Sequence, residues 1–150
     1  MNENLYLYIL MRTDLGSLST GRAAAQASHA ASAFAKKYGN TEGYKKWAKQ
    51  TPQGFGTAIV LGVKFNDIAE LSVNEDVKMF PQEIITDPDY VISISSEIVP
   101  FLNADDGRIL IEAIADKSKY LLHRSEITCA YIFGDKDALQ PILGHLPLYS

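Results

Sequence analysis

Apolar residues form continuous runs in the first half of the chain. Residues 5–11 and 57–63 are almost entirely apolar, which is the pattern of strands buried on both faces. Between them, residues 22–38 are rich in alanine and predict a helix, and residues 42–50 predict a second, shorter one. The order strand, two helices, strand predicts a crossover between two parallel neighbours, and hence an α/β sheet.

Polar residues at the expected helix ends support these boundaries. Ser19 or Thr20 can cap the first helix and Thr41 the second, because short polar side chains accept hydrogen bonds from the free amides of a first turn. Gly39 follows the first helix, and we expect it to end that helix in a left-handed conformation.

The second half of the chain has a less regular pattern, and its elements are predicted from short runs and turn residues. The pattern first predicts a hairpin over 84–92 that turns at Asp87-Pro88-Asp89, and then a helix over about 105–114. Two strands are predicted over 119–123 and 127–133, with a break at 124–126. A short helix that starts at Asp135 or Asp137 follows them. The whole chain therefore predicts one α/β domain of two or three layers.

The composition is that of an ordinary globular domain. The chain has 150 residues, of which 47% are hydrophobic and 21% are charged, and this balance excludes a disordered or fibrous protein. The single cysteine, Cys129, excludes an internal disulfide and a cysteine-rich zinc site. No apolar stretch approaches the ~20 residues of a membrane span, and the first residues lack the basic region of a signal peptide. We therefore expect a soluble, cytoplasmic protein that does not contact a membrane.

Charge is distributed unevenly along the chain. Residues 1–52 hold seven basic and three acidic residues, whereas residues 53–150 hold seven basic and fifteen acidic ones. A polyanion such as RNA is therefore expected to bind the first third of the chain. A helix with a solvated lysine face would produce the same pattern.

Three polar side chains share one face of the alanine-rich helix. At ~100° per residue, Gln26 lies about 40° from Arg22, and His29 lies about 20° from Arg22 on the other side. The loop before this helix ends in Ser-Thr-Gly, and the free amides of the first turn favour an anion. The face is therefore a candidate site, with a merely solvated helix face as the alternative.

Other residues with chemical potential give weaker signals. His29, His123 and His145 lack the spacing of metal ligands, so no metal site is predicted. Cys129 lies in an apolar strand, where a thiol is usually a small core residue. We expect Trp47 to pack in the core, with stacking on a base as the alternative.

Both ends of the chain resemble a known family. Arg12-Thr13-Asp14-Leu15 and the segment 21–30, Gly-Arg-Ala-Ala-Ala-Gln-Ala-Ser-His-Ala, are similar to the R-x-D-L … G-K-x-A-A-Q-x-x-H-A signature of type II peptidyl-tRNA hydrolases. Residues 128–134 and 144–148 resemble the family's final strand and its G-H-L-x-L ending. Because the resemblance does not include 66–104, we expect that segment to be an insertion.

The resemblance implies a mixed, mostly four-stranded sheet flanked by helices, in a protein that is often a homodimer. It implies hydrolysis of the ester between a peptide and the 3′ ribose of tRNA, without a metal or another cofactor. The implied partner is tRNA or peptidyl-tRNA. Such a reaction needs a group that stabilises the oxyanion, a group that orients water, and a basic surface for phosphates.

Candidate residues for these tasks follow from the matched motifs and the charges. Arg22 would stabilise charge, and Gln26 and Thr128 would orient water or substrate. His123 or Glu126 would act as the base. The residues expected to contact substrate lie in the first loop and the first two helices: Asp14, Gly21, His29, Lys36, Lys37, Lys45 and Lys49.

Two departures from the family pattern bear on catalysis. Arg22 replaces the family's lysine, and an arginine keeps its charge but does not titrate as an acid or base. The family's D-A-G-R-T-x segment is matched only in part by Arg124-Ser125-Glu126, and its acidic residue has no counterpart near Leu121. A non-catalytic member of the fold that binds RNA, or an interaction protein that keeps only the fold, are therefore the alternatives.

Overall fold

The computed structural model describes residues 3–95, 110–113 and 119–150. Tertiary contacts divide the chain into two compact units. The first unit consists of Met1–Ile85 and Thr128–Ser150, and the second of Thr86–Ile127.

The first unit is built on a mixed sheet. Strand β1 (Leu5–Arg12) pairs in parallel with β2 (Thr57–Val63) and antiparallel with β5 (Lys119–Asp135), and β3 (Gln82–Ser95) lies on the far side of β5. The order β2-β1-β5-β3 confirms the predicted mixed, four-stranded core of the sheet and its parallel first pair.

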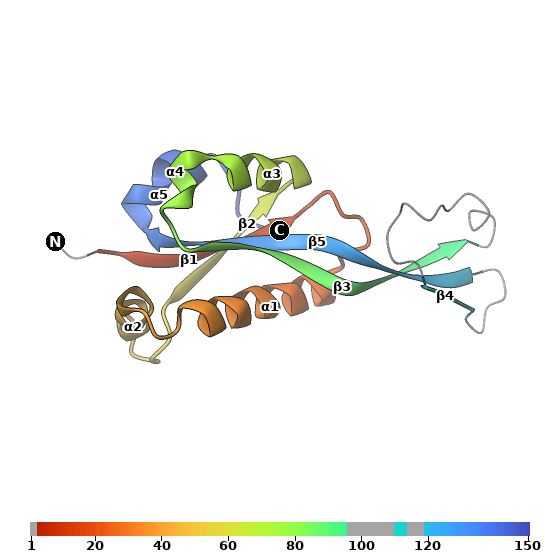
Figure 1. Ribbon diagram of the computed structural model, residues 1–150, viewed down its shortest axis with the longest axis horizontal. Helices are drawn as coiled ribbons and strands as arrows, with labels where there is room; N and C mark the ends of the chain where they lie inside the picture. Colours follow the sequence, from red (N-terminus) through yellow and green to blue (C-terminus); the bar gives the residue numbers. More distant parts are fainter. Residues whose placement is uncertain (1–2, 96–109, 114–118) are drawn as a thin grey trace. The chain divides into compact units, whose positions relative to one another are not determined.

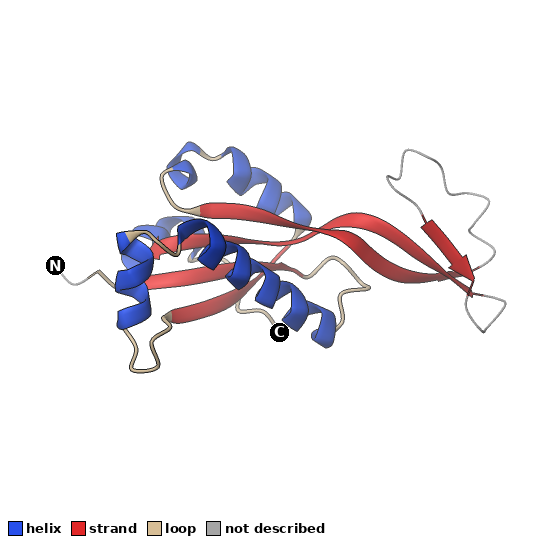
Figure 2. Cartoon of the chain, turned by 60° about the horizontal axis from the view of Figure 1, so that its bottom comes forward, coloured by secondary structure: helices blue, strands red, loops and turns tan. Residues whose placement is uncertain are grey.

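Helices cover both faces of this sheet (Figures 1 and 2). Helices α1 (Thr20–Tyr38) and α2 (Glu42–Lys49) cover one face, and α3 (Phe65–Val73), α4 (Glu75–Lys78) and α5 (Lys136–Leu143) cover the other. The first unit therefore has three layers, which is the larger of the two architectures that the sequence predicted.

Helices α1, α2 and α5 begin at the predicted caps. The hydroxyls of Ser19 and Thr41 accept hydrogen bonds from the amides of Arg22 and Tyr44, and Asp135 caps α5. The prediction for Gly39 is wrong, because Gly39 has φ −58° and donates its amide hydrogen bond to Ala35. Gly39 keeps a helical conformation, and Thr41 then adopts the extended conformation of the α2 N-cap.

An aromatic cluster forms the core between the sheet and the first two helices. The ring of Phe34 lies within 5.5 Å, centroid to centroid, of those of Tyr44, Trp47, Tyr131 and Phe133. Trp47 also donates its indole hydrogen bond to the carbonyl of Thr57, at 2.9 Å. Trp47 is therefore a core residue, as expected, and its ring is not available to stack on a base.

The C-terminal segment covers the edge of the sheet at β2. Leu148 bridges Leu61, and the amides of Gly62 and Tyr149 donate to the carbonyls of Pro147 and Val60. Backbone groups that would otherwise face solvent at an edge strand are thus paired.

In the second half of the chain, three predicted elements are wrong. Asp87-Pro88-Asp89 is not a turn but lies inside the continuous strand β3, where proline is tolerated because β3 has a neighbour on one side only. The predicted break at 124–126 lies inside β5, whose polar residues occupy a strand with partial exposure.

The third wrong element is the helix predicted over 105–114. Strand β4 (Leu110–Ala113) stands in part of this range and pairs antiparallel with β5, with Leu110 opposite His123. A short apolar run fits either a helix or a strand, and here pairing with a neighbour decides. Residues 105–109 and 114 of the predicted helix lie outside the described residues.

Candidate active site

The loop between β1 and α1 is fastened to the start of α3. The guanidinium of Arg12 donates to Asp14 at 2.9 Å and lies 5.3 Å above the ring of Phe65, whose amide donates to the other Asp14 oxygen at 3.0 Å. The amide of Thr13 donates to the carbonyl of Val63 at 2.7 Å. Partial desolvation opposes ionisation of Asp14, but the hydrogen bonds from Arg12 and Phe65 prevail and hold its pKa below the usual value. Asp14 thus orders the loop that leads into α1.

A buried polar pair joins α1 to the sheet. The hydroxyl of Thr128 donates to the side-chain carbonyl of Gln26 at 2.7 Å, and the two residues are only 0% and 4% exposed. The thiol of Cys129 donates to the backbone carbonyl of Gln26 at 3.6 Å. Two predicted site residues from opposite ends of the chain are therefore in direct contact.

The other polar residues of the α1 face flank this pair. The buried stripe of α1 consists of Ala23, Gln26, Ala30 and Phe34, so Gln26 belongs to the side of the helix that packs on the sheet. Arg22 lies one turn earlier and is half-buried, whereas His29 is exposed. The three residues of the predicted helix face therefore differ in exposure: Gln26 is buried against the sheet, Arg22 is half-buried and His29 is exposed.

Gly21 lies at the open N-terminal turn of α1. A Cβ atom built at this position would meet nothing within 4 Å. Packing does not require a glycine there, and the backbone of the first turn is accessible to a ligand.

Two predicted base residues belong to the second unit. The His123 Nδ1 atom lies 2.9 Å from the Asp89 carboxylate, and only 17% of the His123 side chain is exposed. Glu126 forms an ion pair with Arg124 at 2.7 Å, and both residues lie in strand β5. An imidazole that acts as a general base is commonly oriented by a neighbouring carboxylate.

Asp89 is the residue that the sequence did not single out. Its place in Asp87-Pro88-Asp89 looked like a turn signal, and its contact with His123 spans 34 residues. The order of contacts between β3 and β5, with Pro81 bonded to Phe133 and Pro88 to Ser125, is that of an antiparallel pair. Only that pairing brings Asp89 opposite His123.

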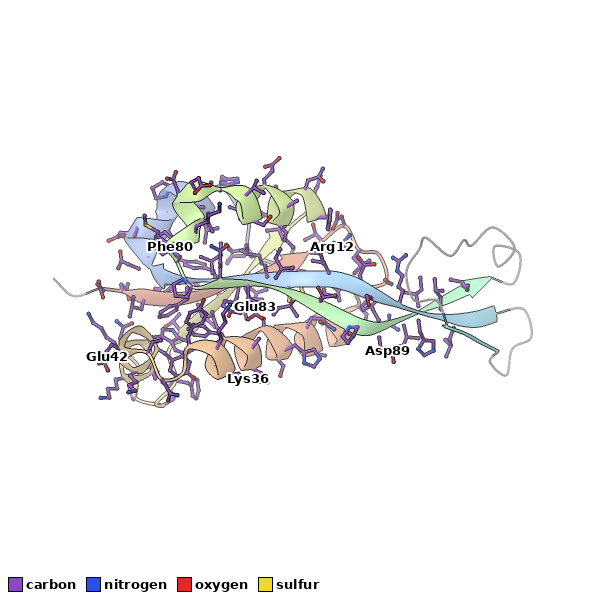
Figure 3. The ribbon with its side chains drawn as sticks, in the orientation of Figure 1. Arg12, Lys36, Glu42, Phe80, Glu83 and Asp89 are labelled. Atoms are coloured by element: carbon purple, nitrogen blue, oxygen red, sulfur yellow. The ribbon has the colours of Figure 1, made fainter. Side chains whose placement is uncertain are left out.

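The predicted phosphate-binding lysines lie at the other end of α1. Lys36 and Lys37 occupy its last turn, and Lys45 and Lys49 are exposed on α2. Figure 3 labels Lys36 on α1 and Glu42 on α2. Arg22 and Lys36 are separated by fourteen residues of helix, which is about 21 Å. These lysines therefore cannot act on the same atoms as Arg22.

Acidic neighbours partly compensate the charge of α2. Lys45 lies 3.8 Å from Glu42, and Lys46 lies 2.9 Å from Glu3. Lys49 lines two surface hollows, of about 650 and 470 Å³, and it forms no ion pair within the described part of the chain. Of the α2 lysines, Lys49 is thus the best placed to bind an anion.

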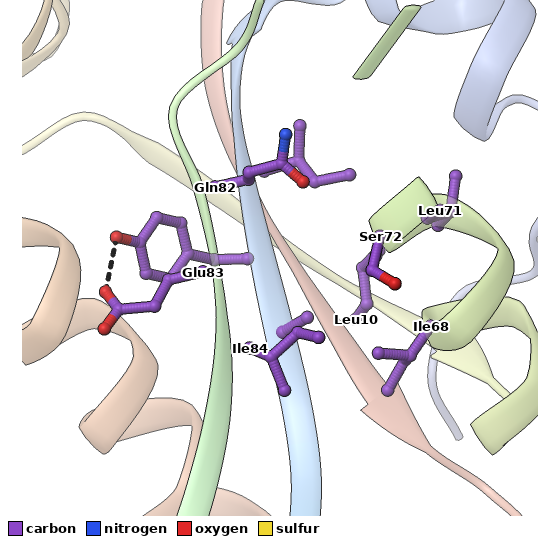
Figure 4. A pocket seen from close by; sticks show the side chains of 10 residues that line it. Leu10, Ile68, Leu71, Ser72, Gln82, Glu83 and Ile84 are labelled. Atoms are coloured by element: carbon purple, nitrogen blue, oxygen red, sulfur yellow. Dashed lines mark hydrogen bonds between the residues drawn. The ribbon is translucent and has the colours of Figure 1, made fainter. Parts of the chain in front are cut away.

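Other features give no alternative active centre among the described residues. Burial raises the pKa of Cys129 to about 11, which makes it an inert core thiol as expected. A cavity beside β1, β3 and α3, about 20 Å³, has room for roughly one water (Figure 4).

The described residues contain no group of three His, Cys, Asp or Glu side chains that could hold a metal ion. No described helix is long and apolar enough to cross a membrane.

Comparison with known families identifies a relationship over most of the first two thirds of the chain. A family model described as Peptidyl-tRNA hydrolase PTH2 matches residues 5–98, which is more than half of the chain. No curated protein matches the sequence. The match includes α1, α2 and β3 up to Ser95, together with much of the segment 66–104, and ends before β5. That 66–104 is an insertion stays a prediction.

Proposed function

The chain belongs to the peptidyl-tRNA hydrolase PTH2 family, and from this premise we propose that it hydrolyses the ester between a peptide and the 3′ ribose of tRNA. The observation that carries the proposal is the buried contact between Gln26 and Thr128, with Arg22 one turn away at the open end of α1. A polar pair is retained here within an otherwise apolar layer, beside a cation. This is the kind of arrangement that orders a water or a carbonyl.

In the proposed reaction, the oxygen of a water attacks the ester carbonyl carbon while a base removes its proton. Arg22 stabilises the negative charge that develops on the carbonyl oxygen. The carbon–oxygen bond to the ribose then breaks, and the leaving ribose oxygen takes up a proton. Because the Thr128 hydroxyl hydrogen is donated to Gln26, Thr128 contributes an acceptor oxygen and the Gln26 amide contributes a donor.

The base of this reaction is proposed to be His123 or Glu126. The contact with Asp89 favours His123, since a carboxylate fixes the imidazole ring and stabilises the imidazolium that forms. Glu126 already forms an ion pair with Arg124, so its carboxylate is engaged by another side chain.

The proposed partner is tRNA, bound through Lys36, Lys37, Lys45 and Lys49, with Asp14, Gly21 and His29 near the reacting end. A cytoplasmic location and a homodimer are also proposed, on the properties implied by the family alone. No metal or other cofactor enters the proposal.

A second candidate function is RNA binding without hydrolysis. It is favoured by Arg22, which stands where the family has a titratable lysine. Measuring turnover of labelled peptidyl-tRNA beside tRNA affinity separates the two functions. A protein that binds tRNA but releases no peptide above the uncatalysed rate would exclude the hydrolase.

The same assay tests the buried pair that carries the proposal. Thr128→Val removes the hydroxyl but keeps the shape, and leaves the buried Gln26 carbonyl without this donor, at a cost of about 1–3 kcal/mol in folding free energy. We expect turnover to fall in Thr128→Val and to be largely restored in Thr128→Ser. Urea denaturation of both variants separates loss of folding from loss of catalysis. Equal turnover in Thr128→Val and the wild type would remove the pair from the mechanism.

A further inference from the structure

The loop from α2 to β2 is held by its own contacts. The amide of Gly54 donates to the carbonyl of Thr51 at 3.2 Å, and the Thr51 hydroxyl donates to the carbonyl of Phe55. Gly54 has φ +84°, a conformation that favours glycine. A Cβ atom at Gly56 would come within 2.4 Å of the Trp47 ring, so the backbone packs directly on that ring.

These contacts hold Phe55 outward. Its side chain is 64% exposed, whereas the aromatic rings of the neighbouring cluster, such as Phe34 and Trp47, are buried. An exposed phenylalanine gives up the favourable transfer free energy that a buried one gains. Folding stability therefore does not explain why this ring stands at the tip of a well-fixed loop.

The helix before the loop carries three lysines, two of which are paired with acidic residues. The loop packs on Trp47 of α2, and α2 carries Lys45, Lys46 and Lys49 on its exposed side. The hollow of about 650 Å³ along this helix is lined by Lys49, by the amide residues Asn4 and Gln50, and by the ion pair of Lys46 with Glu3. Cations that follow a phosphate backbone, beside an aromatic ring on which a base can stack, are the usual elements of a site for single-stranded nucleic acid.

The loop lies far from the proposed reaction. It leads into Thr57, which is opposite Tyr6 at the start of β1, whereas Gln26 contacts Cys129, which is opposite Met11 near its end. Five residues of strand correspond to about 17 Å. A nucleotide at Phe55 is therefore not the one that carries the ester.

We propose that Phe55 stacks on an unpaired nucleotide of the tRNA substrate that is remote from the cleaved ester, while Lys49 binds an adjacent phosphate. This inference rests on the proposed function and adds to it a second contact region for the RNA. The loop would then distinguish a long RNA from a short one, and it would not contact the ester.

The test compares two substrates that carry the same peptide ester. One is a full peptidyl-tRNA, and the other is a short oligonucleotide that ends in the same 3′ nucleotides. Phe55→Ala should raise KM for the full substrate roughly tenfold and leave kcat unchanged, since base stacking is lost. It should not change either constant for the short substrate. Phe55→Trp should behave as the wild type does.

Val73→Ala is the matched control, because Val73 is 71% exposed on α3, on the opposite face of the sheet. Phe55→Ala should also leave the salt dependence of tRNA binding unchanged, since no charge is removed, whereas Lys49→Gln should lower its slope by about one.

Each outcome decides the inference. An unchanged KM for the full substrate in Phe55→Ala would overturn it, and so would an equal loss on both substrates, which indicates a structural role. If the wild type cleaves neither substrate, the proposed hydrolysis fails, and the affinity of wild type and Phe55→Ala for tRNA then decides the stacking contact alone. Absence of tRNA binding by the wild type would overturn both.

Discussion

The two ends of α1 differ in how their polar residues are used. At the N-terminal end, Gln26 is buried against Thr128, and Arg22 is half-buried beside it. At the C-terminal end, Lys36 and Lys37 are exposed and a second helix adds further lysines. Figure 1 shows α2 beside the start of β1, while α1 begins beyond the other end of that strand.

Because of this difference, the two ends of α1 suit different functions. Hydrogen bonds and charge act most strongly where water is excluded, so an ordered, partly buried pair suits chemistry. Exposed lysines act through long-range attraction that salt screens, so they suit binding of a polyanion. Variants at the N-terminal end should therefore change kcat, and variants at the C-terminal end should change affinity and its salt dependence.

The largest expected effect concerns the base, which neither end of α1 supplies. If His123 is the base, His123→Gln should lower the rate by ~10²–10⁴-fold. If Glu126 is the base, Glu126→Gln should have this effect instead.

The measurement is the rate of peptidyl-tRNA hydrolysis by the wild type and both variants. Asp89→Asn sharpens it, because loss of the orienting carboxylate should reduce the rate only if His123 is the base. If neither His123→Gln nor Glu126→Gln lowers the rate by even ~10-fold, both assignments fail. Catalysis would then depend on Arg22, backbone amides and the positioning of water.

Arg22 should have the next largest effect, confined to turnover. Arg22→Ala should reduce kcat by ~10²–10³-fold, as the loss of one oxyanion donor does. Its folding should be retained, because a half-exposed helix position contributes little to stability. Ser28→Ala, at an exposed position on the same helix, is the control and should behave as the wild type.

Arg22→Lys restores the family residue and distinguishes two roles. Equal or higher turnover would show that charge alone is used. An inactive lysine variant would show that the planar guanidinium, with its paired donors, is required. Full activity of Arg22→Ala would contradict a catalytic role of this face.

The lysines of α2 should affect binding rather than turnover. Replacing both Lys45 and Lys49 with Glu should weaken tRNA binding at least tenfold and flatten its salt dependence by about one unit of slope for each phosphate that is no longer neutralised. Lys64 and Lys78, near α3 and α4 on the other face of the sheet, provide a control double variant with the same change of charge. If both double variants bind alike, the α2 lysines are only a solvated face.

Features that are set by residues close together in the chain were predicted from the sequence, whereas features that are set by distant residues were missed. The strand at 57–63 and the caps at Ser19 and Thr41 were predicted correctly, because apolar runs and capping residues act within a few positions. The continuous course of β3 through Asp87-Pro88-Asp89 was missed, since a proline in an edge strand carries the same local signal as a proline in a turn.

The candidate site shows the same limit. Helical angles placed Gln26 beside Arg22, but they could not show that Gln26 is the buried member of the face. That follows from its contact with Thr128, 102 residues further along the chain. The contact of His123 with Asp89 likewise depends on the pairing of β3 with β5, which no short motif encodes.

The smallest expected effect concerns the loop that holds the N-terminal end of α1 in place. Asp14 accepts hydrogen bonds from Arg12 and Phe65, which outweigh partial desolvation and lower its pKa in the folded state. A lowered folded-state pKa stabilises the fold above the pKa of an unfolded aspartate, ~3.9, and this contribution disappears as the pH falls through the folded-state value. Asp14→Asn should therefore lower stability by less than about 1 kcal/mol at pH 7, because the pair is partly exposed.

At pH 2 the difference in stability between the wild type and Asp14→Asn should be smaller than at pH 7, since protonation of the wild-type carboxylate increases as the pH falls. Thermal unfolding of both proteins at pH 7 and pH 2, in low salt, measures this change. Glu70→Gln, an exposed carboxylate on α3, controls for the general loss of one negative charge. A difference that is as large at pH 2 as at pH 7 would mean that Asp14 orders the loop through shape and neutral hydrogen bonds, and that its charge contributes nothing to holding Arg22 and Gln26 in position.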